Sequence, residues 1–246
     1  MFNCPYSNAS FGPFSEVLPT SLPCSASDLS PSDSPTSIAL ASFATKYNIH
    51  LVAGSIPERD AANRLYNTSL VLNPAGHFIA KHRKLHLFDI DVPGRMTFKE
   101  SDTLTAGSDF TAFDTPWGRV GLGICYDIRF AEYAQVLRQA GCSMLVYPGA
   151  FNTTTGPLHW ELLARARAVD TQCFVLVCSP ARNAASTYQA WGHSSVVSPW
   201  GRVAATTEEG EAAVVCECDM KEVEEFRQMV PTGLQKRNDL YRLTAV

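Results

Sequence analysis

Cys125 lies where an apolar run ends and a polar one begins. Residues 120–124 are rich in Val, Leu and Ile, which is typical of a buried strand, and Tyr126 and Asp127 follow at once. A helix-compatible stretch continues from Phe130. A strand that delivers a thiol to the start of a helix favours the thiolate, because the N-terminus of a helix carries partial positive charge. Cys125 is therefore a candidate nucleophile, although a lone cysteine after a strand is more often a packing residue.

A cluster of basic residues occupies one short segment of a chain whose formal net charge is −4. On an extended strand, the side chains of Lys81 and Arg83 point to one side and those of His82 and Lys84 to the other. We expect Lys81 and Arg83 to form an exposed basic edge. Lys84 leads directly into the apolar segment 85–88, so we expect its ammonium group to reach an interior site.

Several motifs follow one another in a fixed order. They are R-K-L-H-L-F at residues 83–88, F-K-E-S at 98–101, G-L-G-I-C-Y-D-I-R-F at 121–130, Y-P-G-A-F-N-T-T-T-G at 147–156, S-P-A-R at 179–182 and W-G-H-S-S-V-V-S-P-W-G at 191–201. In this order they resemble the nitrilase superfamily of carbon–nitrogen hydrolases, and the later motifs are most similar to its omega-amidase branch. The resemblance runs from Phe2 to about Tyr241.

The resemblance implies a Glu–Lys–Cys triad that hydrolyses an amide or nitrile through a thioester. Cys125 matches the nucleophile, and Lys84 matches the lysine whose ammonium group stabilises the oxyanion of each tetrahedral intermediate. The backbone N–H of Tyr126 is expected to be the second oxyanion donor. Glu100 matches a second glutamate that orients the lysine and the substrate. The family needs no metal, and no cofactor is implied.

The family's general-base glutamate is expected to be absent from this sequence. In the family it belongs to a Pro-Glu-x-Phe motif followed by a Pro-Tyr pair, and residues 1–6 fit only the second half, so the glutamate would immediately precede Met1. Glu16 and Glu58 are the nearest internal substitutes, but neither has the strand-end context. A misassigned or alternative start, a splice product and a truncated paralogue are three accounts, of which we favour the first. The chain as written is expected to be close to inactive.

The composition indicates one domain. At 46% apolar residues, 246 residues can bury one substantial core, and we expect a single carbon–nitrogen hydrolase domain over 1–246, incomplete at its N-terminus. Alternating strands and helices predict a layered α/β fold. The resemblance implies a four-layer α-β-β-α sandwich without its first strand–helix–strand unit. We expect helices at 37–47, 131–140, 158–169 and 219–229, strands at 49–54, 65–72, 78–82, 143–147, 172–178 and 214–218, and a polar loop at 57–64.

Further residues are candidates for the substrate pocket. Phe151 and Asn152 follow the strand after the nucleophile, where α/β proteins place ligands. Arg182 and Tyr188 could meet a substrate carboxylate, because arginine binds carboxylates through two hydrogen bonds.

Three histidines, His86, His159 and His193, have no metal-ligand spacing, so we expect them to be hydrogen-bonding or packing residues. Beside Cys125, Asp127 and Arg129 are expected either to pair with each other or to lie on the surface.

The composition also excludes several classes of function. A sequence pI near 5.9 suggests no nucleic-acid partner, and no run of eighteen apolar residues predicts a membrane span. The N-terminus lacks a basic region followed by an apolar core, so no secretory signal is expected. Several of the eight cysteines lie in apolar runs, which indicates a reducing cytoplasm, with a mitochondrial form left open.

Three hypotheses remain for the function. The first is an omega-amidase-like hydrolase that releases ammonia from dicarboxylate monoamides such as 2-oxoglutaramate and 2-oxosuccinamate, acting as a homodimer on a small molecule. The second keeps the chemistry but changes the substrate to deaminated glutathione or an N-carbamoyl compound. The third is a non-catalytic chain that binds a partner or dimerises with a full-length homologue through an unpaired sheet edge.

Overall fold

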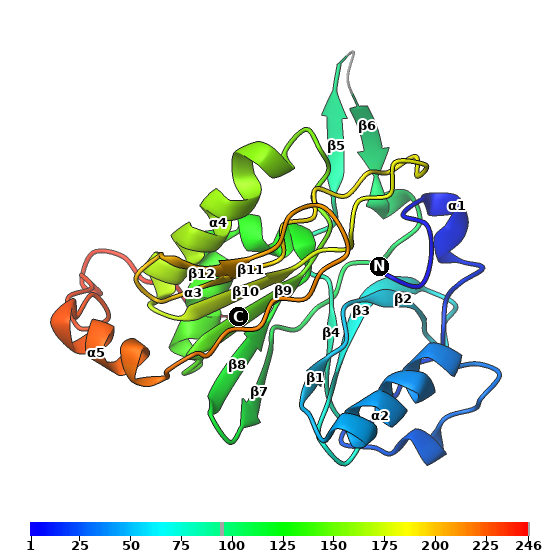
Figure 1. Cartoon of the computed structure of the whole chain (residues 1–246), viewed down its shortest axis with the longest axis horizontal. Helices are drawn as coiled ribbons and strands as arrows, with labels where there is room; N and C mark the ends of the chain where they lie inside the picture. The colour runs from blue at the N-terminus through cyan, green and yellow to red at the C-terminus, as the bar shows by residue number, and fades with distance from the viewer. Residues whose placement is uncertain (94–95, 246) are drawn as a thin grey trace. The chain divides into compact units, whose positions relative to one another are not determined.

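A computed structural model describes residues 1–93 and 96–245 of the chain. The chain divides into two compact units, Met1–Thr111 and Ala112–Val246. Each unit contains its own sheet with a helix packed against it (Figure 1). The chain therefore has two cores, and each is described by itself below.

The first unit is built around one long, buried strand. β3 (Leu65–Leu72) pairs antiparallel with β1 (Leu51–Val52), β2 (Ile56–Arg59) and β4 (Phe78–Arg83). The helix α2 (Pro35–Tyr47) packs against β3. Its smallest apolar side chains lie in the core together with apolar residues of the strands. This core contains Leu18, Ala41, Ala44, Ala53, Ile56, Leu70, Leu72 and Phe78.

Shorter elements complete the first unit. They are α1 (Asn8–Phe11), the 3₁₀ helices η1 (Ala26–Asp28) and η2 (Glu100–Asp102), and the antiparallel pair β5 (Asp89–Val92) and β6 (Met96–Lys99). The helix η2 begins directly where β6 ends, so Glu100 stands at a change of backbone direction. This change of direction turns its side chain inward, where it is fully buried.

The second unit contains a six-stranded sheet in the order β12-β11-β10-β9-β8-β7. Its central strands β8, β9 and β10 run parallel, so each connection between them must cross over. The helices α3 and α4 form these crossovers, and they pack against each other, as Figure 1 shows. The elements are β7 (Thr111–Thr115), β8 (Gly118–Leu122), η3 (Cys125–Arg129), α3 (Ala131–Gln139), β9 (Met144–Pro148), α4 (Gly156–Thr171), β10 (Phe174–Cys178), β11 (Ser195–Val197), β12 (Val203–Thr206) and α5 (Lys221–Met229).

Most of the predicted helices and strands are confirmed, within a few residues at their ends. Two predictions are wrong. The expected polar loop 57–64 contains most of β2, whose residues pair with the start of β3. The expected strand 214–218 has no assigned strand. Instead, Cys216 and Cys218 are half-buried and pack beside Phe174 and Val223. Apolar alternation there reflects packing on a core without a ladder of hydrogen bonds.

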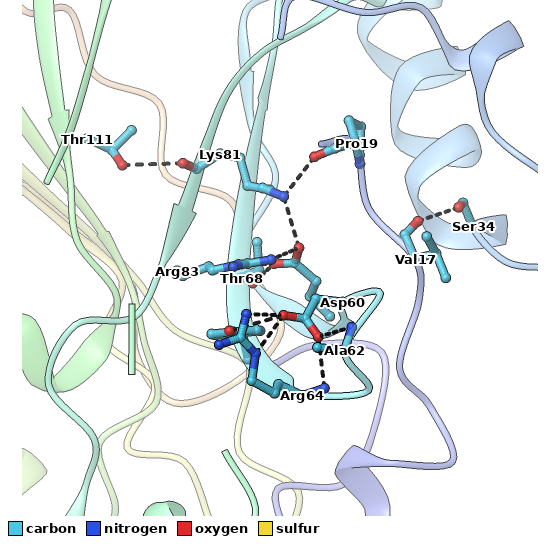
Figure 2. A network of polar contacts seen from close by, with 12 residues as sticks. Val17, Pro19, Ser34, Asp60, Ala62, Arg64, Thr68, Lys81, Arg83 and Thr111 are labelled. Atoms are coloured by element: carbon cyan, nitrogen blue, oxygen red, sulfur yellow. Dashed lines mark hydrogen bonds and ion pairs between the residues drawn. The ribbon is translucent and has the colours of Figure 1, made fainter. Parts of the chain in front are cut away.

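The expected exposed basic edge is also wrong. The side chains of Lys81 and Arg83 are only 14% and 28% exposed, and both bind the buried carboxylate of Glu58 on β2. Figure 2 shows this network, in which Thr68 on β3 also takes part. The predicted alternation along β4 is correct, because His82 and Lys84 are both buried on the other side. The two sides of β4 therefore differ in the residues that they meet, and those residues come from other segments of the chain.

Candidate active site

Lys84 and Glu100 form a fully buried ion pair in the first unit. The ammonium nitrogen of Lys84 lies 2.5 Å from Oε2 of Glu100, and both side chains are 0% exposed. The same carboxylate oxygen accepts the backbone N–H of Phe88 at 2.6 Å. The other oxygen accepts a hydrogen bond from the hydroxyl of Tyr6. Glu100 therefore holds the ammonium group of Lys84 in position.

The backbone around Lys84 is held on both sides. Its N–H donates to the carbonyl of Asn67 at 2.8 Å, and its carbonyl accepts the N–H of Gly107 at 2.8 Å. A Cβ at Gly107 would lie 2.3 Å from the carbonyl oxygen of Arg83, so only glycine fits at this point. In a low-dielectric surrounding, a fixed positive charge acts strongly on a developing oxyanion. The first unit thus supplies a preorganised cation.

Cys125 adopts a strained backbone conformation in the second unit. Its φ is +50°, in the left-handed region that costs a non-glycine residue about 1–2 kcal/mol. Gly149, the residue directly after β9, approaches very closely, because a Cβ there would lie 2.8 Å from the Cα of Cys125. Strain of this kind persists only where surrounding structure enforces it, and it gathers at functional sites. The observed φ therefore supports Cys125 as the reacting residue.

A buried carboxylate holds the turn that presents Cys125. Asp127 is 0% exposed, and its Oδ2 accepts the N–H of Ile124 at 2.8 Å. A surface role for Asp127 is therefore wrong. The helix that starts at Cys125 is the five-residue 3₁₀ helix η3, and the longer helix α3 begins only at Ala131. The turn itself, more than a long helix, positions the thiol.

Arg129 is a half-buried cation that interacts electrostatically with Cys125 in the second unit. Its guanidinium group lies 4.6 Å from the ring centre of Phe151 and 5.6 Å from that of Tyr126. Its Nη1 is 3.2 Å from Nδ1 of His159. Burial lowers the pKa of Arg129, and the nearby Tyr126 and Cys125 oppose that effect. Among the residues that the structure describes, no carboxylate forms an ion pair with Arg129.

The side chain of Asn152 closes a turn in the loop that precedes α4. Oδ1 of Asn152 accepts the backbone N–H groups of Thr154 and Thr155 at 3.1 and 2.8 Å, just before α4 begins. Phe151 is buried, and its ring centre is 5.0 Å from that of Trp160. Phe151 therefore lies with Tyr126 beside Arg129, whereas Asn152 organises the loop.

The two residues proposed to meet a substrate carboxylate have backbone partners. Arg182 donates to the carbonyls of Ala190 and Trp191 at 3.2 and 3.0 Å. The hydroxyl of Tyr188 donates to the carbonyl of Ala150 at 2.5 Å. Sequence reasoning placed Arg129 near the nucleophile but gave it no role towards the substrate. The signal that could have found it is an arginine within one turn of the nucleophile and next to aromatic residues.

One group of side chains among residues 1–93 and 96–245 has the spacing to hold a metal ion. The ligand atoms of His193, Glu208 and Glu209 lie within 4.8 Å of one another, and both glutamates are exposed. His193 also stacks on Trp191, with ring centres 4.2 Å apart. Exposed acidic groups of this kind are common without a metal, so we assign no ion here.

The functional residues are thus divided between the two units, with Lys84 and Glu100 in one and Cys125 in the other. Comparison with known proteins identifies the family to which the chain belongs. The family model of carbon–nitrogen hydrolases matches residues 1–228. The chain belongs to the carbon–nitrogen hydrolase family. It is accordingly an enzyme that hydrolyses carbon–nitrogen bonds, as the motif order indicated.

Relatives in this family are similar over almost the whole chain. Omega-amidase NIT2 of Bos taurus is 52% identical over 244 residues, which cover 99% of this chain and 83% of the relative. A chloroplastic omega-amidase of Arabidopsis thaliana is 50% identical and covers 100% of this chain and 64% of the relative. The crystal structure of Saccharomyces cerevisiae Nit3, a member of branch 10 of the nitrilase superfamily, matches with a TM-score of 0.83 and 45% identity, covering 95% of this chain and 79% of Nit3. The predicted nitrilase-like α/β class is confirmed.

Among residues 1–93 and 96–245, no helix is both long enough and apolar enough to cross a bilayer.

Proposed function

We propose that the chain is an omega-amidase-like hydrolase that removes the terminal amide of short dicarboxylate monoamides, such as 2-oxoglutaramate and 2-oxosuccinamate. The observation that supports this proposal most directly is the setting of Arg129. It is a half-buried cation beside Cys125, without a carboxylate partner among the described residues. A substrate with a free carboxylate at the end opposite its amide would provide that partner. The similarity to relatives named omega-amidase supports the same substrate class.

The proposed reaction proceeds through a thioester on Cys125. The sulfur attacks the amide carbon, and the positive charge of Lys84 and the N–H of Tyr126 stabilise the resulting oxyanion. The C–N bond then breaks, and ammonia leaves with the proton that the general base took from the thiol. Water attacks the thioester with the same base accepting its proton, which releases the carboxylate product and restores the thiol. Glu100 holds Lys84 in place throughout.

The general base is proposed to be a further glutamate, as the family resemblance implies, because neither Glu16 nor Glu58 fits that role. The two internal glutamates have other partners. Glu16 accepts the backbone N–H groups of Thr36 and Ser37 at 2.8 and 3.1 Å at the start of α2. Glu58 holds Lys81 and Arg83. Chemical rescue tests this assignment, because formate should raise ammonia release if neither Glu16 nor Glu58 serves as the base. An equal rate with formate and with chloride would contradict it.

The test of the substrate class compares two amides in the presence of formate. With 2-oxoglutaramate, mass spectrometry should detect an acyl group on Cys125, and Cys125→Ala should abolish both the adduct and ammonia release. The variant Arg129→Met should raise KM for 2-oxoglutaramate at least tenfold and leave that for the uncharged amide butyramide unchanged. Arg165→Met, on the exposed side of α4, is the matched control. An equal rise in KM for both amides would show that Arg129 does not recognise the substrate carboxylate.

Two rival substrates share the same catalytic residues. Deaminated glutathione and N-carbamoyl compounds also present a carboxylate near a cleavable C–N bond. Side-by-side values of kcat/KM for the three classes decide among them, and a higher value for either rival would replace the proposal. Failure of any acyl-enzyme to form, with the chain folded, would favour the non-catalytic binding form.

The assembly and location are proposed as well. We propose a homodimer that works in the cytoplasm, with no nucleic-acid or membrane partner. The plant relative is named chloroplastic, so related chains are found in organelles too. Sedimentation equilibrium should give twice the mass of 26.9 kDa, and a mass equal to one chain would contradict the dimer.

A further inference from the structure

A pocket of about 390 Å³ lies in the second unit, between the helices α3 and α4 and the C-terminal segment 232–243. Residues of all three segments line it. None of these residues takes part in the proposed hydrolysis. The pocket is therefore a separate feature of the unit. The polar residues that line it include Gln135, Arg138, Asp170, Lys236 and Arg242.

The lining of the pocket has an excess of positive charge. Arg138, Lys236 and Arg242 all line it, against a single carboxylate, that of Asp170. Asp170 is already engaged, because its Oδ2 accepts a hydrogen bond from Arg167 at 2.9 Å. Lys236 donates to the neutral amide oxygen of Gln135 at 2.9 Å. No charge inside the pocket thus balances its cations.

Arg138 has the most unfavourable surroundings of these cations. No hydrogen bond or ion pair to it is found among the described residues, and its electrostatic neighbours include a second guanidinium, that of Arg227. Burial and the charge of Arg227 both lower the pKa of Arg138. Arg227 itself donates from Nη2 to the carbonyl of Cys142 at 2.8 Å, and its Nε is buried with no hydrogen-bond partner. Two half-buried like charges oppose the fold unless an anion lies between or beside them.

We propose that this pocket binds a compact dianion, such as inorganic phosphate or a short dicarboxylate, through Arg138, Lys236 and Arg242. Arginine binds the planar edges of carboxylates and phosphates through paired hydrogen bonds, and lysine adds a point charge. The volume admits a small anion together with water, and Gln135 links Lys236 to α4 because its Nε2 donates to the carbonyl of Asp170 at 2.6 Å. The site is independent of the proposed amide hydrolysis.

The test measures phosphate binding by calorimetry at constant ionic strength. The wild-type chain should bind inorganic phosphate with a saturable stoichiometry of one. The variants Arg138→Gln and Arg242→Gln should each raise Kd at least tenfold. Arg202→Gln removes the same charge from an exposed position and should leave Kd unchanged. Arg242 is exposed and forms no interaction among the described residues, so its variant keeps the test valid if Arg138→Gln fails to fold.

A second titration, with succinate in place of phosphate, distinguishes a dicarboxylate site from a phosphate site. Tighter binding of succinate, weakened by Arg138→Gln, would identify a dicarboxylate site separate from Arg129. Tighter binding of phosphate would identify a phosphate site. Equal Kd values for the Arg138→Gln and Arg202→Gln variants would overturn the proposal. The absence of saturable binding of both anions, or an effect that chloride reproduces, would overturn it too.

Discussion

Two buried glutamates of the first unit hold cations from the same stretch of chain, one on each side of β4. Glu58 binds Lys81 and Arg83 at 2.9 and 2.6 Å, and Glu100 binds Lys84 at 2.5 Å. The side chains of both glutamates are almost fully buried. Only the cations differ, because those of Glu58 reach solvent in part whereas Lys84 does not.

This difference separates the structural cluster around Glu58 from the ion pair that is proposed to take part in catalysis. Glu58 lies on β2, accepts the hydroxyl of Thr68 on β3 at 2.6 Å and binds two residues of β4, so it joins three strands (Figure 2). Its two cations share one carboxylate and remain partly hydrated. The side chain of Lys84 is 0% exposed, so water does not screen its charge. A charge that solvent does not screen acts more strongly on a nearby oxyanion.

Replacing Lys84 should have the largest effect. Lys84→Met removes the charge that is proposed to stabilise the oxyanion, and kcat for ammonia release should fall by about 10²–10³. It also leaves Glu100 buried without its cation, which should lower the free energy of unfolding by about 3–5 kcal/mol. Formate-supplemented kinetics and urea unfolding measure the two effects. Lys81→Met is the matched control on the other side of β4, and an equal loss of kcat in that variant would erase the distinction.

Replacing Glu58 should affect stability without affecting catalysis. Glu58→Gln removes the carboxylate that holds three strands, and the free energy of unfolding should fall by about 1–3 kcal/mol, because the released cations can turn towards water. Urea unfolding at pH 7 measures this loss, and kcat should remain that of the wild type. A tenfold loss of kcat at unchanged stability would show that the Glu58 cluster also positions Lys84.

The stability that Glu58 provides should disappear in acid. Burial alone would raise its pKa, but the hydrogen bond from Arg83 and the charge of Lys81 outweigh burial and lower it below the ordinary value of 4.5. A lowered folded-state pKa stabilises the fold above the unfolded pKa, and this contribution is lost as the pH falls through the folded pKa. The difference in unfolding free energy between wild type and Glu58→Gln should therefore be constant from pH 7 to about 5 and shrink at lower pH. A difference that grows in acid would contradict this sign.

The smallest effect is expected at Tyr6. Tyr6→Phe removes the hydroxyl that donates to Glu100 but keeps the ring that lies 5.5 Å from both Phe11 and Phe98. The loss of one hydrogen bond to a buried carboxylate should cost about 1–2 kcal/mol and lower kcat about fivefold to tenfold. Steady-state kinetics of the variant measure it. Tyr47→Phe, on the exposed face of α2, is the control, and identical kinetics in the two variants would show that Glu100 stays in place without the Tyr6 hydroxyl.

Local patterns predicted much of the fold. The strand at residues 65–72 was predicted with both ends correct, because its run of apolar and β-branched residues lies between turn-forming segments. The end of α2 was predicted from Asn48, which adopts the left-handed conformation with φ of +52° that asparagine tolerates. The strand at 214–218 was wrong, because alternation can also arise when an irregular segment packs on a core.

The motifs in their order determined the family and the candidate residues, since Lys84, Glu100 and Cys125 each stand in a recognisable local phrase. Only the tertiary structure decided which charges meet. Glu58 finds Lys81 and Arg83 through the pairing of β2 and β4 with β3, and that register is not encoded within any one segment. The strained φ of Cys125 likewise accompanies the close approach of Gly149, which follows another strand, β9. Short-range patterns reflect each residue's own preference, whereas pairing of distant charges depends on how the strands align.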